Sequence, residues 1–215
     1  MAVDGVLATT PTFQPLVAVR PGLRVPAHVD GFELAVRAVV GQQVSVAGAR
    51  TILARLVAEH GSSLDGIGLR DGVTRLFPTP EAIAAIDPAD LAMPRSRGRA
   101  LVSVAEAVVD GSVLLDRGAD RAEVRASLLA LPGIGPWTAD YVAMRALGDP
   151  DVWLGTDIGV VHALRSLGRH SAPGDGVDAA ELESIRPWRS YAVLHLWSRL
   201  SEPPAPDQLK KGTAS

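Results

Sequence analysis

An eleven-residue stretch, L-P-G-I-G-P-W-T-A-D-Y from Leu131 to Tyr141, carries the residues with the clearest chemical meaning. Gly133 and Gly135 allow the backbone to turn tightly and have no side chain to block the approach of another molecule. The helix that we expect to begin near Pro136 presents N–H groups and partial positive charge at its first turn. The sequence therefore predicts a phosphate-binding site made of backbone groups, at Gly133, Gly135 and Thr138.

A P-G-x-G sequence also links two packed helices without any ligand, and for the four residues alone this is the better interpretation. The whole stretch, with its helical flanks, is far more specific. A phosphate site of this type needs no lysine or arginine. It would position a duplex without selecting a base sequence.

Helices must position this turn, and signals for helix ends recur along the chain. Asp30, Ser45, Thr79 and Asp120 are N-cap candidates, each followed by an apolar pattern of helical period. Strand signals are almost absent, and aromatic residues make up only 4% of the chain. We expect an all-α protein with further helices over 96–109, 136–148, 157–167, 178–185 and 187–200.

Composition narrows the classes of function. Hydrophobic residues make up 47% and charged residues 21%, which is typical of a globular protein, and no apolar run is long enough to span a bilayer. The absence of cysteine excludes disulfides, zinc fingers, a cysteine nucleophile and a cysteine-held iron–sulfur cluster. The net charge of −3 gives no support to a nucleic-acid partner, so DNA binding would have to depend on a local site.

Leu131 to Tyr141 resembles the helix–hairpin–helix of the HhH-GPD superfamily of base-excision DNA glycosylases. Further stretches are similar to its AlkA-type branch, 3-methyladenine-DNA glycosylase II, in the same order along the chain. They are R-P-G-L-R-V-P from Arg20, G-Q-Q-V-S-V from Gly41, F-P-T-P from Phe77 and P-W-R-S-Y-A-V-L-H-L-W from Pro187.

The resemblance implies a fold of two helical lobes with the active-site cleft between them. The glycosylase core would cover residues 21–202, with the hairpin at 120–148 and a catalytic loop at 149–157. Residues 1–20 are then expected to be an irregular lead-in and residues 203–215 a flexible tail. The N-terminal α/β domain that AlkA-type enzymes usually carry ahead of this core is expected to be absent.

The activity implied by the resemblance is hydrolysis of the N-glycosidic bond between a damaged base and deoxyribose, as in base-excision repair. Asp157 lies where the family places its catalytic aspartate. A carboxylate beside the sugar stabilises the positive charge that grows in the transition state, and it can orient or deprotonate the attacking water. From its own surroundings in the sequence, Asp157 is better interpreted as the N-cap of a helix that begins at Ile158. Both roles can hold together.

Trp137 occupies the position at which bifunctional members carry a lysine nucleophile. Because indole cannot form a Schiff base, we expect a monofunctional glycosylase without lyase activity. Trp137, Tyr141 and Trp197 match positions that line the base pocket, where a flipped-out base stacks on aromatic rings. Electron-rich rings suit bases made cationic by alkylation, such as 3-methyladenine and 7-methylguanine. The alternative is a place in the core, above all for Trp197.

Gln43, or its neighbour Gln42, matches the residue that fills the space left by the flipped base; a solvated turn is the alternative. The carbonyls of Leu129, Leu131 and Gly133 match positions that hold a monovalent cation, Na⁺ or K⁺, beside a DNA phosphate. No other cofactor is expected. Ile158 stands where some relatives have an aromatic residue, which affects the range of lesions accepted. His162 and His195 lack metal-ligand spacing and are interpreted as structural histidines with satisfied hydrogen bonds.

We expect a monomeric, cytoplasmic bacterial enzyme that acts on damaged double-stranded DNA and has no membrane partner. Two other functions stay open. One is a glycosylase for deaminated or oxidised bases, and the other is a non-catalytic helix–hairpin–helix module that only binds DNA. Asp157 distinguishes an enzyme from a module, because a module needs the glycines but no carboxylate.

Overall fold

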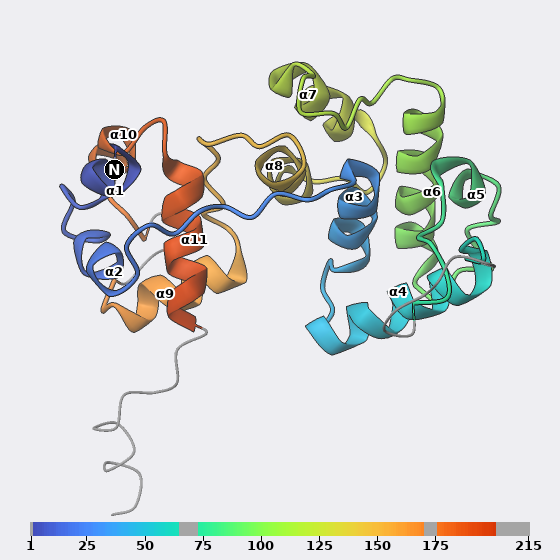
Figure 1. Ribbon diagram of the computed structural model, residues 1–215, viewed down its shortest axis with the longest axis horizontal. Coiled ribbons are helices and arrows are strands. Elements are labelled where there is room, and N and C mark those ends of the chain that lie inside the picture. Colours follow the sequence, from blue (N-terminus) through green and yellow to red (C-terminus); the bar gives the residue numbers. More distant parts are fainter. Residues whose placement is uncertain (1, 65–72, 170–175, 201–215) are drawn as a thin grey trace, which may run out of the picture. The chain divides into compact units, whose positions relative to one another are not determined.

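The computed structural model describes residues 2–64, 73–169 and 176–200 (Figure 1). Helices dominate these residues, and no strand forms among them; an isolated antiparallel bridge joins Ser63 to Arg75. Within the same ranges, no helix is long and apolar enough to cross a membrane. The prediction of an all-α protein is confirmed.

The chain forms two compact units, one made of residues 1–25 and 150–215 and the other of residues 26–149. This confirms the prediction of two helical lobes. The predicted tail over 203–215 lies outside the described residues. The first unit contains α1 (Ala2–Leu7), α2 (Gln14–Val19), α9 (Ile158–Ser166), α10 (Ala179–Ser184) and α11 (Arg189–Leu200).

The second unit holds the predicted hairpin, and its helices begin where the sequence signals indicated. Each of the four N-cap candidates, Asp30, Ser45, Thr79 and Asp120, accepts a backbone N–H from the first turn of its helix. The helices are α3 (Gly31–Val40), α4 (Val46–His60), α5 (Pro80–Ala84), α6 (Arg95–Val109), α7 (Arg121–Ala130) and α8 (Pro136–Arg145).

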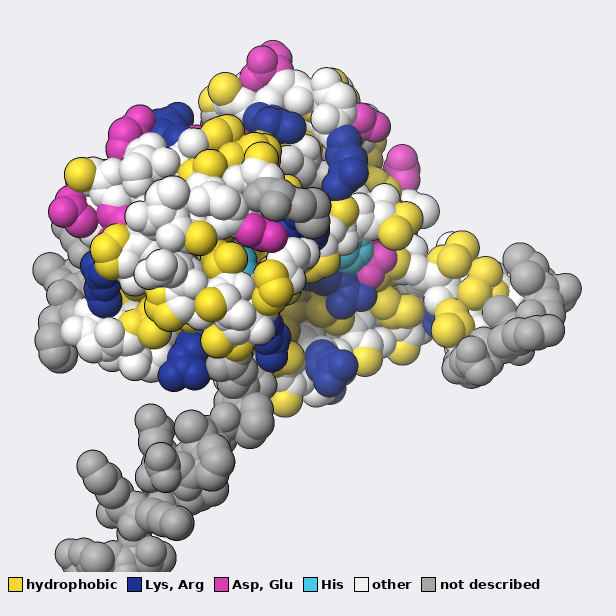
Figure 2. All heavy atoms as spheres, turned by 60° about the vertical axis from the view of Figure 1, so that its left-hand side comes forward, with side chains coloured by type: hydrophobic (Ala, Val, Ile, Leu, Met, Phe, Trp, Pro, Cys, Tyr) yellow, Lys and Arg dark blue, Asp and Glu magenta, His cyan; other side chains and the backbone are white. Residues whose placement is uncertain are grey.

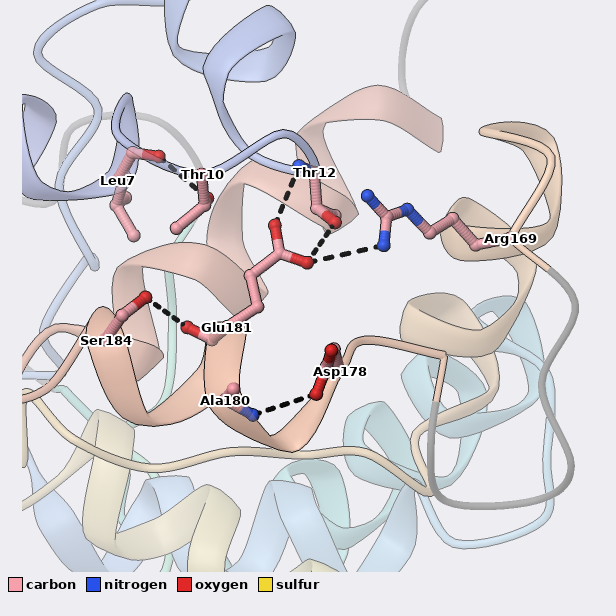
Figure 3. A network of polar contacts seen from close by, with 8 residues as sticks. All are labelled: Leu7, Thr10, Thr12, Arg169, Asp178, Ala180, Glu181 and Ser184. Carbon is pink, nitrogen blue, oxygen red and sulfur yellow. Dashed lines mark hydrogen bonds and ion pairs between the residues drawn. The ribbon is translucent and has the colours of Figure 1, made fainter.

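Residues 1–20 are not the irregular lead-in that was predicted, because they contain α1 and α2. Figure 3 shows how they are tied to the C-terminal part of the same unit. Both Glu181 carboxylate oxygens accept hydrogen bonds from Thr12, one from its backbone N–H and one from its hydroxyl, each at 2.8 Å. Arg169 contacts the same carboxylate at 3.3 Å. The segment that joins the short helices α1 and α2 is thus held by a contact with a residue distant in the sequence.

The packing of α3 brings the loop between α3 and α4 close to the hairpin between α7 and α8. The helix contacts both α6 and α8, and its apolar side chains Val36, Val39 and Val40 are fully buried. Burial of such side chains is the main favourable term in helix packing. Because α3 lies against α8, the loop that follows α3 is placed beside the hairpin that precedes α8.

The two histidines differ from the prediction of satisfied structural residues. His162 is exposed. His195, on α11, is fully buried, and neither ring nitrogen has a hydrogen-bond partner within the described part of the chain. Burial lowers the pKa of His195 and Arg24 adds to this shift, whereas Asp4 and the backbone of Leu16 oppose it.

Candidate active site

The loop that leads to Asp157 is fastened to the start of α11. The Ser190 hydroxyl accepts the N–H of Val152 at 2.9 Å, and the Ser190 N–H donates to the carbonyl of Pro150 at 3.0 Å. Arg189 donates to both carboxylate oxygens of Asp151, at 2.7 and 2.9 Å. A two-point contact of this kind fixes orientation as well as distance. The loop therefore has a defined course through Asp151 and Val152.

Asp157 is both the N-cap of α9 and the partner of an indole. Its Oδ1 accepts the N–H of Val160 at 2.9 Å and the Nε1–H of Trp197 at 2.8 Å. Asp157 is buried, with 8% of its surface exposed to solvent. Two N–H donors and the positive end of a helix dipole stabilise a negative charge at this point. The carboxylate is accordingly held in one orientation, in contact with little solvent.

Gly159 has no side chain, and this allows Trp197 to lie close to α9. A Cβ atom at this position would lie 3.0 Å from Asp157 Oδ1 and 3.1 Å from Trp197 Cδ1. Trp197 is half-buried on α11, which packs against α9 (Figure 1). The structure thus gives Trp197 a contact with Asp157 that was not predicted, and its proposed place in the base pocket stays a prediction.

Ile158 is the first residue of α9 and follows Asp157 directly. Its side chain is 73% exposed. An apolar side chain of this size on the surface beside a fixed carboxylate is available to contact a bound molecule. The structure therefore makes Ile158 a candidate for contact with substrate.

Glycine is favoured at the two hairpin positions, 133 and 135, for different structural reasons. Gly133 has φ of +78°, and a Cβ there would lie 2.9 Å from Ala100 Cβ on α6. Gly135, the N-cap of α8, has φ of −94°, and a Cβ at this position would have no neighbour within 4 Å. Gly133 is thus favoured by its backbone conformation and by close packing, whereas Gly135 leaves open space in front of the first turn of α8.

Trp137 and Tyr141 lie one turn apart on α8 and stack on each other. Their ring centroids are 5.2 Å apart and the planes differ by 18°. The Arg145 guanidinium lies 5.7 Å from the Tyr141 ring centroid, and its Nε donates to the carbonyl of Pro26. Both aromatic residues are half-buried. They form a flat aromatic surface on the helix that follows the hairpin.

Gln42 and Gln43 occupy different environments in the loop between α3 and α4. Gln42 is half-buried, and its Nε2 donates to the Thr138 hydroxyl at 2.8 Å. Gln43 is exposed and has φ of +56°. The Thr138 side chain, at 3% exposure, is engaged inside the protein, so a phosphate contact at Thr138 would have to use its backbone amide.

The predicted cation ligands are neutral backbone oxygens at the end of α7 and in the hairpin. The Leu131 carbonyl accepts the N–H of Ile134 at 3.3 Å, and the Gly133 carbonyl lies 3.4 Å from Gln42 Nε2. Leu129 belongs to the last turn of α7, whose carbonyls have no partner within the helix. A carbonyl oxygen has two lone pairs, so these long contacts leave capacity for a cation. The donor chemistry fits Na⁺ or K⁺, and the site stays a prediction.

Charge is mixed on the face of the molecule that Figure 2 shows. On the face shown in Figure 2, Lys and Arg side chains form separate groups among acidic and apolar ones. This agrees with the net charge of −3. This face therefore presents no single continuous basic patch to an anionic polymer.

Comparison with known proteins agrees with this geometry. Residues 36–188 match the family described as HhH-GPD superfamily base excision DNA repair protein. The chain belongs to the HhH-GPD superfamily. The match includes the hairpin, the loop of the two glutamines and Asp157.

Relatives cover most of the chain. It is 42% identical over 205 residues to the probable bifunctional transcriptional activator/DNA repair enzyme AlkA of Mycobacterium tuberculosis. It is 39% identical over 189 residues to DNA-3-methyladenine glycosylase 2 of Escherichia coli. These matches cover 94% and 85% of this chain but only 40% and 62% of the two relatives.

A solved structure supports the same fold. The 3-methyladenine DNA glycosylase Mag1 of Schizosaccharomyces pombe, in complex with abasic DNA, matches with a TM-score of 0.70 and 23% sequence identity. The match covers 92% of this chain and 96% of that one. The HhH-GPD fold is thus shared over nearly the whole chain.

Within each of the two units, several residues that support the candidate site residues were not predicted. Asp151 and Ser190 fasten the loop to α11, Gly159 admits Trp197, and Arg145 supports Tyr141. Arg145 could have been found, because it lies four residues after Tyr141 on the same helix face. The Asp151–Arg189 pair, 38 residues apart, left no such signal.

Proposed function

We propose that this HhH-GPD protein is a monofunctional DNA glycosylase that removes alkylated purines, of the 3-methyladenine and 7-methylguanine type, from double-stranded DNA. The observation that carries the proposal is the Asp157 carboxylate, held by Val160 and Trp197 with little exposure to solvent. Capping of α9 accounts for the bond from Val160, and the second bond, from Trp197, holds the carboxylate in the single orientation that catalysis requires. Relatives named as 3-methyladenine glycosylases support the substrate class.

Asp157 acts on the deoxyribose. As the N-glycosidic bond breaks, positive charge develops on the sugar, and a negative group fixed beforehand stabilises it without having to reorganise. Asp157 also accepts a proton from, or orients, the water that attacks the sugar carbon. An alkylated, cationic purine leaves readily by itself, so no second acidic group is assigned to the leaving base.

The ring pair on α8 receives the flipped base. A base must leave the duplex before its glycosidic bond can be reached, and stacking on Trp137 and Tyr141 compensates for the stacking it loses. A cationic purine gains further from the electron-rich indole face. We assign the larger part to Trp137, because Arg145 already brings positive charge near Tyr141.

The start of α8 binds a DNA phosphate. Gly135 leaves the space in front of this helix open, and helix N-termini favour negative charge. Gln43 enters the duplex where the flipped base was and can form hydrogen bonds to the remaining partner base. The enzyme works as a monomer on chromosomal DNA in the bacterial cytoplasm, with Na⁺ or K⁺ at the hairpin carbonyls as an aid to phosphate binding.

The experiment is to incubate the protein with duplexes that carry methylated, deaminated or oxidised bases and to identify the released bases by mass spectrometry. We expect 3-methyladenine and 7-methylguanine to be released and abasic sites to remain in an unbroken strand. If only deaminated or oxidised bases were released, the protein would be a glycosylase for those bases and not for alkylated purines. Binding without release of any base would leave only the DNA-binding module.

The monofunctional assignment has its own test. With Trp137 at the lysine position, borohydride added during the reaction should trap no covalent protein–DNA adduct. A trapped adduct would show that another amine of the chain attacks the sugar and that the lyase activity is present.

A further inference from the structure

The loop between α3 and α4, residues 41–45, is fixed at both ends by helix termini. The N–H of Gly41 donates to the Arg37 carbonyl at 2.9 Å, which ends α3. The Ser45 hydroxyl accepts the N–H of Gly48 at 3.1 Å, which begins α4. The middle of the loop, Gln42 and Gln43, must therefore be positioned by other contacts.

Gln42 connects this middle part to the hairpin. Its Nε2 donates to Thr138 Oγ1 at 2.8 Å and lies 3.4 Å from the Gly133 carbonyl oxygen. A side-chain amide carries two N–H groups, so one glutamine can contact both acceptors. Thr138 lies in the first turn of α8 and Gly133 in the turn before it, and both are 91 or more residues away from Gln42 in the sequence.

Gln43, the next residue, has an unfavourable backbone conformation that contacts of its neighbours must stabilise. Its φ of +56° lies in the left-handed region, which is unfavourable for a residue with a side chain. Conformations of this kind persist where the surroundings hold them, and they are common at functional sites. The Gln43 side chain is exposed, whereas that of Gln42 is half-buried.

We propose that Gln42 is a positioning residue, which ties the loop to the hairpin and so sets the direction in which Gln43 enters the duplex. The inference rests on the proposed function, because it needs a duplex from which a base has been flipped. It assigns the two adjacent glutamines different tasks: Gln43 touches DNA, and Gln42 couples it to the part of the protein that holds the phosphate.

The test compares three variants with the wild type: Gln42→Met, Gln43→Ala, and both together. Methionine has nearly the length of glutamine but no N–H donor, so it removes the bond and keeps the volume. Fluorescence anisotropy measures the affinity for an intact duplex and for a duplex with an abasic-site analogue. A 2-aminopurine opposite the abasic analogue reports insertion of the wedge.

We expect Gln42→Met to weaken binding to the abasic duplex roughly tenfold, as for loss of one hydrogen bond of this kind, and binding to the intact duplex less than about twofold. Gln43→Ala should give the same pattern, and the double variant should be no worse than Gln43→Ala alone. Equal losses for both duplexes would overturn the proposal, because Gln42 would then serve only phosphate binding. Additive losses in the double variant, or no change, would overturn it as well.

A second measurement needs no DNA and separates this inference from the proposed function. Hydrogen exchange of the free protein should show faster exchange in residues 41–45 of Gln42→Met, with the amides of α6 unchanged. Thr138→Val, which removes the acceptor hydroxyl, should have the same effect on the loop. Unchanged exchange in both variants would overturn the positioning role. Failure of the wild type to bind any duplex would overturn the proposed function, while the exchange data would still show whether Gln42 fixes the loop.

Discussion

The indole Nε1–H of Trp197 donates to Oδ1 of Asp157 at 2.8 Å, between residues 40 apart in the sequence. The same oxygen accepts the N–H of Val160, so one carboxylate oxygen is held by a helix start and by a side chain from another helix. This relationship makes Trp197 a positioning residue for Asp157, in addition to any contact with the base. The two bonds also fix the orientation of the buried carboxylate, which the role proposed for Asp157 requires.

Trp197→Phe tests this relationship, because phenylalanine keeps an aromatic ring and loses the N–H donor. We expect the single-turnover rate of base release to fall about 10- to 100-fold, the value of a hydrogen bond to a charged group. The affinity for the abasic duplex should change little.

Two further variants serve as a control and as an independent test of the same contact. Trp188→Phe, also in the first unit, is the matched control and should keep the wild-type rate. Gly159→Ala approaches the same contact from α9, where a Cβ would lie 3.1 Å from Trp197 Cδ1, and should lower the rate in the same direction. A Trp197→Phe enzyme that releases the base at the wild-type rate would show that the bond does not position Asp157.

The hairpin glycines provide a second prediction. Gly135→Ala fits the space and the backbone of this position, so it should cost at most about 1 kcal/mol of unfolding free energy. It should nevertheless weaken duplex binding about tenfold, because the methyl group lies where the phosphate must approach. Gly133→Ala should instead destabilise the protein by about 1–3 kcal/mol, through positive φ and the contact with Ala100.

Thermal unfolding and anisotropy on the same samples check both variants. An alanine at position 135 that leaves affinity unchanged over a range of salt concentrations would place the phosphate elsewhere. The salt range matters because contacts with phosphate weaken as counterions compete.

Gln43→Gly separates stability from function at the wedge. Glycine accepts the positive φ at no steric cost, so the variant should be as stable as the wild type or more stable, by up to about 1 kcal/mol. Removing the side chain should still lower the affinity for an abasic duplex, as in Gln43→Ala. Denaturant unfolding measures the first effect. A clear loss of stability in Gln43→Gly would mean that the glutamine side chain serves the fold rather than DNA.

His195 predicts how stability depends on pH. Because burial lowers its pKa in the folded protein, the unfolded state binds a proton more readily. Its contribution to stability is therefore complete above the unfolded pKa of about 6.5 and is lost as the pH falls below it. His195→Leu removes the titrating group and two buried nitrogens without partners among the described residues. The melting temperature should fall less between pH 7.5 and 5 in this variant than in the wild type, and equal slopes would assign the pH dependence to other groups.

Local rules account for what the sequence predicted well. Asp30, Ser45, Thr79 and Asp120 each cap a helix because a short polar side chain bonds to amides two or three residues away. Such contacts are encoded within one turn. The capping role of Asp157 was predicted for the same reason, and the structure shows that capping and a fixed carboxylate are compatible.

Long-range contacts account for what the sequence did not predict. The helices α1 and α2 have six residues each, and prolines interrupt the segment that contains them. The Thr12–Glu181 contact that ties this segment to α10 joins residues 169 apart. The bond between Gln42 and Thr138 joins residues 96 apart, so the sequence could not show which of two adjacent glutamines is held. His195 was expected to be satisfied because buried polar groups usually are, a statistical rule that this packing does not follow.

The most direct measurement is the single-turnover rate of 3-methyladenine release from a methylated duplex by the wild type and by Asp157→Asn. Asparagine is as good an N-cap as aspartate and can still accept the bonds from Val160 and Trp197, so the fold should persist while the charge is lost. We expect equal melting temperatures, similar affinity for an abasic duplex and a rate lower by about 100-fold or more. A variant that releases the base at the wild-type rate would contradict the assignment of Asp157 as the group that stabilises the sugar cation.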